Sequence, residues 1–209
     1  MSIAYVQSRL SVTGVVTTGQ TLAYSSDVAV GSLLVVVVGI VGQGAPRTVT
    51  VTDSLGHTYT QAGSYATNGN NSVGIFYFPG TIAGACTVTV TPSGSTALRI
   101  AIHEYSGADA GSVLDSTSTN TGTGTSATTG TVTASMNEDL IVAGVLNPGG
   151  GTATVDAAFT MRTGYTNGFG SADDVSSSSA GATFTLSASG AWAAMGASFL
   201  PIAARLYAP

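Results

Sequence analysis

The densest group of ionisable residues lies between Leu98 and Asp115 and includes His103, Glu104 and Asp109. Imidazole and carboxylate side chains are the usual general acids and bases of enzymes. Alternation of Leu98, Ile100 and Ile102 with Arg99, Ala101 and His103 predicts a strand with one face in a core. On a strand, His103 and Glu104 point to opposite faces and cannot act as a pair without a bulge. The sequence therefore favours a structural role for them, as polar residues at the rim of a sheet.

Paired carboxylates are the machinery of most glycoside hydrolases. Five acidic residues could supply such a pair, but no motif selects two of them: Glu104, Glu138, Asp139, Asp173 and Asp174. The last three could also hold Ca²⁺ in a loop, although no Asp-x-Asp-x-Asp-Gly pattern accompanies them. A glycoside hydrolase-like β-sandwich enzyme remains an alternative that the sequence supports with residue types alone.

Other catalytic and cofactor signatures are missing. The chain has no Gly-x-Ser-x-Gly elbow, no zinc-ligand spacing and no phosphate loop, and Gly42-Gln-Gly44 is best interpreted as a turn. Cys86 is the single cysteine, so no internal disulfide forms, and its setting favours a small buried apolar group over a reactive thiol. We therefore predict no catalytic residue, no cofactor and no metal.

The amino-acid composition limits the classes of partner that the chain can bind. Charged residues make up 7 % of the 209-residue chain, against about 25 % in an average soluble domain, while 44 % of residues are hydrophobic. There is no Lys, the five Arg are dispersed, and the formal net charge is −5, so nucleic acid is a poor partner. A surface of Ser, Thr, Asn and Gly suits a protein packed against neighbours in an assembly. It is also the ordinary composition of a Thr-rich β-sandwich.

No targeting or membrane segment is evident. Met1 to Leu10 lacks a basic region followed by an apolar one and has no small-residue cleavage site. The longest apolar run, Leu33 to Val41, is too short to cross a bilayer. We expect synthesis in the cytoplasm without a signal peptide, and no membrane partner.

Short alternating segments separated by turn residues run through the chain. Val49 and Val51 alternate with threonines, and Thr87 to Thr91 reads Thr-Val-Thr-Val-Thr. The unbroken Leu33 to Val41 run is typical of a central strand buried on both faces. Turn signals at a spacing of roughly 8 to 12 residues favour a sandwich or barrel.

The second half of the chain repeats the layout of the first. Asp139 to Val145 matches Leu33 to Val41, and Thr183 to Gly190 matches Thr87 to Gly94. Ala191 to Leu200 is expected to be a final core strand, with a short Ala-rich helix as the alternative. Two copies of one unit, separated by the Thr/Gly/Ser stretch from Ser116 to Gly130, are the simplest account.

These patterns predict an all-β fold: a jelly-roll-like or Ig-like antiparallel β-sandwich built from two pseudo-repeated six-strand halves. The expected organisation is an N-terminal arm (1–9), a sandwich (10–200) with pseudo-repeats 10–115 and 116–200, and a C-terminal tail (201–209). The first edge strand is the alternative for residues 1–9. The halves could form two sandwiches or interleave into one. One sandwich is favoured, because Ser116 to Gly130 is expected to be strand and loop and contains no charged or Pro-rich linker.

Both ends carry apolar side chains suited to binding a neighbouring subunit by strand addition or by lying across it. The expected partner-binding residues are Ile3, Tyr5, Val6, Ile202, Leu206 and Tyr207.

Several features resemble the β-sandwich structural proteins of tailed bacteriophage virions, above all capsid decoration (cement) and accessory proteins. They are the Met1-Ser-Ile start, the Thr-Val-Thr-Val and Gly-Thr-Gly-Thr repeats, the missing Lys, and the terminal arm and tail. The resemblance implies a non-catalytic virion protein that bridges subunits of the major capsid or another virion protein, as a homo-oligomer at symmetric lattice sites.

A carbohydrate-binding or adhesin-like module of a tail fibre or bacterial surface is the second class of function that the residues allow. Seven aromatic residues could offer faces on which sugars stack: Tyr59, Tyr65, Phe76, Tyr77, Phe78, Tyr105 and Tyr165. The single Trp lies in an apolar stretch expected in the core, which weakens this interpretation.

Overall fold

The computed structural model describes residues 2–202, apart from the side chains of residues 176 and 177. Within that range the chain forms fifteen β-strands and no α-helix. The predicted all-β class is confirmed, and every strand pair in the sheets is antiparallel.

The first half of the chain builds two sheets. The larger, here called the first sheet, has the order β1 (Ala4–Val16), β9 (Thr96–Ser106), β3 (Leu33–Gly42), β7 (Asn71–Phe78) and β5 (Thr60–Gln61), with β6 (Ala66–Asn68) also on β7. The smaller consists of β2 (Gln20–Ala23), β8 (Thr87–Pro92) and β4 (Val49–Asp53).

The second half builds one six-stranded sheet, here called the second sheet. Its order is β10 (Leu114–Thr128), β15 (Thr183–Phe199), β11 (Asp139–Leu146), β14 (Phe169–Ser177) and β13 (Thr160–Thr166), with β12 (Ala153–Val155) on β15. The ends of the long strands β10 and β15 pair with each other and with β12, as β2, β8 and β4 do in the first half. This match in strand order confirms the predicted two halves.

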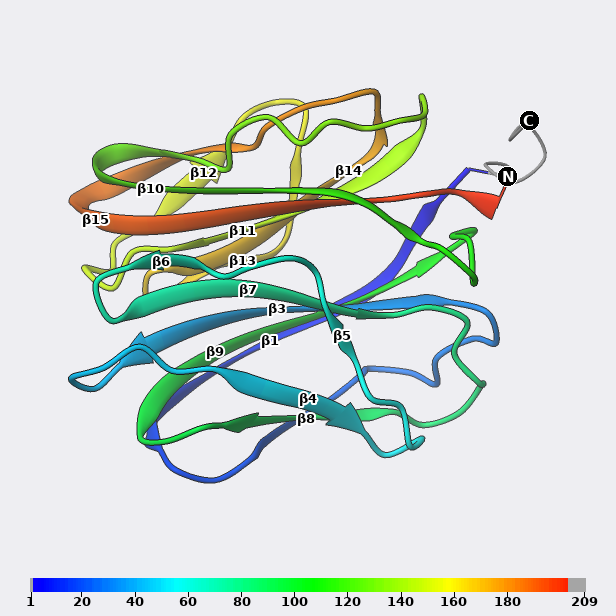
Figure 1. The fold of residues 1–209 in the computed structure, drawn as a ribbon, viewed down its shortest axis with the longest axis horizontal. Helices are drawn as coiled ribbons and strands as arrows, with labels where there is room; N and C mark the ends of the chain where they lie inside the picture. Colours follow the sequence, from blue (N-terminus) through cyan, green and yellow to red (C-terminus); the bar gives the residue numbers. More distant parts are fainter. Residues whose placement is uncertain (1, 203–209) are drawn as a thin grey trace.

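Figure 1 shows the sheets stacked, with β10, β15 and β11 above β7 and β3, and β4 and β8 below. Three layers of buried side chains fill the spaces. One packs between the small sheet and the first sheet, one between the first and second sheets, and one on the far face of the second sheet. Each large sheet is therefore buried on both faces, as the Val-rich Leu33 to Val41 run predicted.

The two large sheets approach closely where their central strands carry glycine. A Cβ built on Gly39 of β3 would lie 2.8 Å from the Phe169 ring, and one on Gly144 of β11 would overlap Val37. The two glycines occupy matching places in the two halves, in Val-Gly-Ile and Ala-Gly-Val. A side chain at either position requires the packed Phe169 ring or Val37 to shift.

Three points of organisation follow from the strand pairing. Residues 4–9, expected as a terminal arm or as the first edge strand, are the first part of β1 and pair with β9. The stretch 116–130, expected as strand and loop, is mostly the edge strand β10. The halves do not interleave into one sandwich, because each sheet draws its strands from one half only.

The last strand decides between two alternatives for the C-terminal region. Thr183 to Phe199 is a single 17-residue strand, β15, so the expected core strand over this region is confirmed and the Ala-rich helix is not formed.

Candidate functional site

A buried polar cluster, here called the interface cluster, joins the first sheet to the second. His103 Nε2 lies 2.9 Å from Ser171 Oγ, and the Tyr105 hydroxyl donates to Asp173 Oδ2 at 2.7 Å. Arg162 Nε donates to both oxygens of Asp173, at 2.8 and 3.0 Å. His103 and Tyr105 come from β9, while Arg162, Ser171 and Asp173 come from β13 and β14.

The His103 and Ser171 pair has the donor and acceptor types of a nucleophile and its base, yet its setting opposes that chemistry. Both residues are fully buried, and within residues 2–202 no hydrogen bond orients His103 Nδ1. Burial, with a smaller contribution from Arg162, lowers the pKa of His103 to about 3. An imidazole this reluctant to bind a proton is a poor base, so the pair acts as a hydrogen bond between the halves.

Glu104 points the other way from His103, as the strand pattern predicted, and both oxygens of its carboxylate accept hydrogen bonds. Oε1 accepts from the Ala29 amide at 2.7 Å and from Ser32 Oγ at 2.8 Å, and Oε2 accepts from Gln7 Nε2 at 2.7 Å. The rim position expected for His103 and Glu104 is wrong, because neither has any exposed surface. Glu104 instead holds the loop before β3 against the first sheet.

A second carboxylate organises the turn after β4. Asp53 Oδ1 accepts from the amides of Leu55 and His57, while Oδ2 accepts from the Tyr59 hydroxyl at 3.0 Å and from His57 Nδ1 at 3.0 Å. Cys86 Sγ donates to the same Oδ2 at 3.5 Å. Burial and Asp53 raise the pKa of Cys86 to about 12, so the thiol stays protonated. The prediction that Cys86 is buried is confirmed, and its hydrogen bond to Asp53 was not expected.

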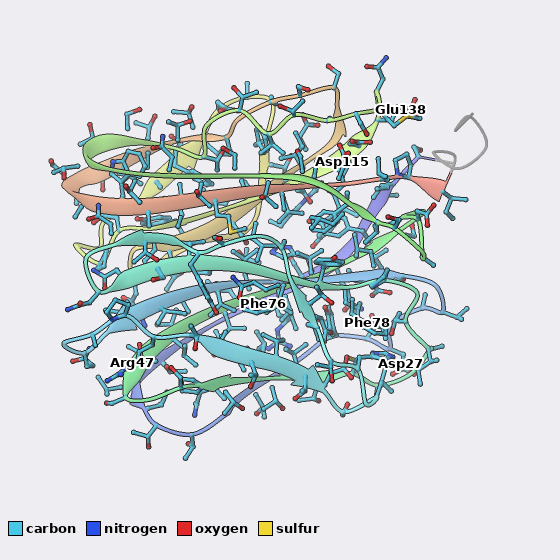
Figure 2. All side chains as sticks on the ribbon, viewed as in Figure 1. Asp27, Arg47, Phe76, Phe78, Asp115 and Glu138 are labelled. Carbon is cyan, nitrogen blue, oxygen red and sulfur yellow. The ribbon has the colours of Figure 1, made fainter. Side chains whose placement is uncertain are left out.

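Asp139 is the most perturbed of the predicted carboxylates. It is fully buried, and neither oxygen has a hydrogen bond of good geometry to the described part of the chain. Burial and the neighbouring Asp115 raise its pKa to about 7, against weaker opposition from the amides of Met136 and Ser135. Figure 2 shows Asp115 and the exposed Glu138 at the same end of the second half.

The five predicted acidic residues do not assemble into a hydrolytic pair around a groove. Glu104 lies in the first sheet and Asp173 in the second, each engaged by its own donors. Neither groove described below is lined by any of the five. Among residues 2–202 no group of three or more His, Cys, Asp or Glu side chains is placed to hold a metal ion.

Exposed apolar side chains gather at one end of the molecule, here called the terminal end. Val30 is 77 % exposed, Ile82 55 % and Ile202 49 %. The Gly31 amide donates to the Thr81 carbonyl at 2.7 Å, which brings the loops that carry Val30 and Ile82 together. An apolar groove of about 410 Å³ lies beside them, lined by Gly31, Ala108, Asp109, Ala110, Gly111 and Ile202.

Both described ends of the chain meet at this terminal end. A Cβ on Gly107 would lie 2.5 Å from the Ser2 carbonyl oxygen, and the Ile202 amide donates to the Gly107 carbonyl. The structure thus brings together regions that the sequence treated as two separate ends.

The predicted partner-binding residues differ in exposure. Val6 and Ile202 are exposed, and Tyr5 is half-buried, edge-on to Tyr105 and beneath Arg162. Ile3 is unsuited to the role because it is buried in the core between the two large sheets. Leu206 and Tyr207 lie outside the described residues. The groove was not predicted, since its lining comes from loops far apart in sequence.

A second, polar groove of about 330 Å³ lies where the two halves meet. Its lining comes from the β6 region and from β10: Tyr65, Ala66, Thr67, Thr119, Asn120 and Thr121. Nearby, Asn68 Nδ2 donates to the carbonyls of Gly122 and Trp192 and ties the halves together.

No family model and no curated protein matches this chain. The crystal structure of the STIV MCP, a viral major capsid protein, aligns with 100 % of this chain and 99 % of its own at 10 % identity and a TM-score of 0.29. So low a TM-score carries no argument about fold or function. In the described part of the chain, no helix has the length and apolar character needed to span a bilayer.

Proposed function

We propose that this chain is a non-catalytic structural protein of a virus particle, and specifically a decoration protein that binds the shell of a tailed bacteriophage and bridges its subunits. The observation that carries the proposal is the terminal end, where Val30, Ile82 and Ile202 stand exposed around one apolar groove. Exposed apolar residues concentrated in one place mark an interaction surface more often than isolated ones do.

The polar residues support the same conclusion. The buried ionisable groups His103, Glu104, Asp53 and Asp173 are engaged in hydrogen bonds within the protein. The exposed residues in the described part of the chain are largely Ser, Thr and Gly. A weakly charged surface with one apolar end suits a protein held permanently against neighbours.

The proposal is tested with particles that lack the chain. Such particles should release their genome at lower temperature or weaker osmotic shock than complete ones, and adding the purified protein should restore their resistance. The variant Val30→Asp should fail to restore it, because a carboxylate in the interface loses its water without gaining a partner.

Val15→Asp is the matched control. Val15 is also exposed, at 58 %, but it lies near the other end of β1, where it pairs with Ala97. The control should restore resistance as well as the unaltered chain does. Equal stability of particles with and without the protein would refute a cement role.

Carbohydrate binding is the second candidate, favoured by the polar groove. Threonine hydroxyls and amides are groups that recognise sugar hydroxyls, and Thr119, Asn120 and Thr121 line this groove. A glycan array separates the two candidates, since specific binding that Asn120→Ala abolishes would support a receptor-binding module in place of a shell protein.

A further inference from the structure

β10 forms one edge of the second sheet (Figure 1), and among residues 2–202 no strand pairs with its outer side. From Ser116 to Gly124 it pairs with β15 in unbroken register. Within this stretch, here called the regular edge, every residue is Ser, Thr, Asn or Gly. A regular edge strand with unpaired N–H and C=O groups is a template for a further strand.

Hydrogen bonds from two asparagine side chains identify which peptide groups of the regular edge point outward. The carbonyl oxygens of Gly122 and Trp192 both accept from Asn68 Nδ2, at 2.9 and 3.1 Å, so they lie close together, as in a pair that exchanges both ladder hydrogen bonds. The next amide back along β10, that of Thr121, donates to Asn120 Oδ1 at 2.9 Å rather than to β15. Peptide groups alternate in direction along a strand. Those that point away from β15 are therefore the groups of Thr117, Thr119, Thr121 and Thr123.

The other edges of the two large sheets are protected against pairing. β1 has two register shifts and carries Arg9, and β13 has one register shift and carries Arg162. The remaining edge consists of β5 and β6, which have two and three residues. Bulges, charges and short length are the means by which proteins keep sheet edges from pairing. The regular edge of β10 has none of these features, so we expect it to be covered in the working protein.

The regular edge is complementary to itself. In an antiparallel pairing of two copies centred on Asn120, Thr119 lies opposite Thr121 and Thr117 lies opposite Thr123, which are the residues whose peptide groups point outward. All four threonines are exposed in the single chain, and threonine pairs across strands are favourable. No charge lies within the paired stretch, so two chains of net charge −5 meet without a like-charge contact there.

We propose that the outer side of β10, from Ser116 to Gly124, pairs antiparallel with the same stretch of a second copy of this chain. The second sheets of the two copies then form one continuous sheet across a two-fold axis at Asn120, and each copy contributes the same residues. The inference goes beyond the proposed function, because this contact needs only two copies of the chain and no shell protein.

The first experiment measures the oligomeric state of the full chain by light scattering over a range of concentrations. The unaltered chain should form dimers that dissociate on dilution. Thr119→Pro removes an outward N–H and no hydrogen bond to β15, and an outward-facing proline is tolerated in an edge strand. It should weaken dimerisation by about tenfold or more, because the two-fold axis makes the loss two hydrogen bonds.

Thr121→Lys is a second variant, which keeps the backbone and places like charges from the two copies at diagonal positions in the contact. It should leave the chain monomeric. Thr21→Lys, the same change at an exposed site on β2, and Thr119→Val, which keeps the amide, should dimerise as the unaltered chain does. Circular dichroism checks that each variant keeps its strands. A monomeric full chain, or dimers that survive both Thr119→Pro and Thr121→Lys, would overturn the proposal.

The second experiment tests the register by disulfide cross-linking. In a Cys86→Ser background, Asn120→Cys places one thiol from each copy at the two-fold axis. Opposite Cα atoms in such a pair lie about 4.5 Å apart, within the span of a disulfide, so mild oxidation should link two chains. In the control Thr117→Cys the two thiols lie about 20 Å apart along the strands and should not be linked. Equal cross-linking of the two variants would contradict the pairing.

The remaining outcomes separate this inference from the proposed function. Dimers of a chain that binds no particle support the inference and refute the decoration role. A full chain that stays monomeric in solution, and whose binding to particles is abolished by Thr121→Lys, assigns the edge to a shell protein and overturns the second copy as its partner.

Discussion

His103 illustrates how burial decides what a residue can do. Its Nε2 is bonded to Ser171, its Nδ1 has no partner among residues 2–202, and the ring has no exposed surface. An unfolded chain binds a proton there below about 6.5, whereas the native protein binds one only near 3. Unfolding therefore takes up a proton between these values, and the free energy of unfolding falls as the pH drops through that range.

The variant His103→Leu tests this directly. It removes the ring's only proton site, so the acid loss of stability between about pH 6.5 and 3, on the order of 3 kcal/mol from a shift of this size, should largely disappear. At pH 7.5 the variant should be less stable by about 1 to 3 kcal/mol because Ser171 loses its partner. Urea denaturation at several pH values measures both effects.

His57→Gln provides the matched control, since His57 is the other histidine and lies at the turn after β4, away from the interface between the halves. The His57→Gln variant should lose stability at acid pH as the unaltered protein does. An unchanged pH profile in His103→Leu would contradict the account of the interface cluster.

Asp139 should give the free energy of unfolding the opposite dependence on pH. Its pKa is about 3.8 in the unfolded chain and about 7 in the native protein, so unfolding releases a proton between these values. The free energy of unfolding therefore falls as the pH rises from about 4 to 7. Asp139→Asn should reduce this fall in stability with rising pH. At pH 8 the variant should be more stable than the unaltered protein, by about 1 to 2 kcal/mol.

Denaturation of Asp139→Asn between pH 4 and 8 checks the prediction. Asp115→Asn is the companion variant, because it removes the carboxylate that faces Asp139 and should shift the same limb to lower pH. If neither variant alters the slope, Asp139 is not the group that holds the proton.

The residue patterns of individual strands explain the fold more simply than any cluster of side chains does. Alternation placed Leu98, Ile100 and Ile102 correctly in the core against the small sheet, and placed Ala101 and His103 on the opposite face. It could not supply the partners, because Ser171 lies 68 positions away in the other half. Period-two patterns fix which way a side chain points, while contacts depend on how the sheets stack.

The sequence left the edge strands open between alternatives, a terminal arm or a first strand for residues 1–9, and strand and loop for 116–130. β10 is rich in Thr, Ser and Gly, and β1 begins with residues that resemble a free arm. An edge strand has one unpaired side and little apolar alternation, so composition alone does not distinguish it from a loop. Only the pairing of β1 with β9 and of β10 with β15 reveals the role of each.

The loop before β3 depends on one carboxylate, which Glu104→Gln tests. The amide keeps one acceptor oxygen but turns an NH₂ group toward donors from Gln7, Ala29 or Ser32. We expect a loss of about 1 to 3 kcal/mol in unfolding free energy and faster hydrogen exchange at the Ala29 amide. Glu138→Gln, at an exposed site, should change neither. Loss of a measurable glycoside hydrolysis in either variant would favour the enzyme alternative.

At the scale of the whole molecule, two halves with the same strand order are joined by their large sheets. Gly144 of β11 is the tightest point, since a Cβ there would overlap Val37 across the interface. Gly144→Ala should therefore destabilise the protein by about 1 to 3 kcal/mol. Gly14→Ala should have little effect, because a methyl group added at Gly14 would have nothing within 4 Å. Equal melting temperatures for the two variants would mean that the halves are not packed as described.

The central claim is that this chain is a structural component of a virus particle, and mass spectrometry of purified particles from its source tests it most directly. The account predicts peptides of this chain in the particles, in a fixed ratio to the major capsid protein and retained through density-gradient purification. Absence of the chain from purified particles, or amounts that fall with each purification step, would contradict the account.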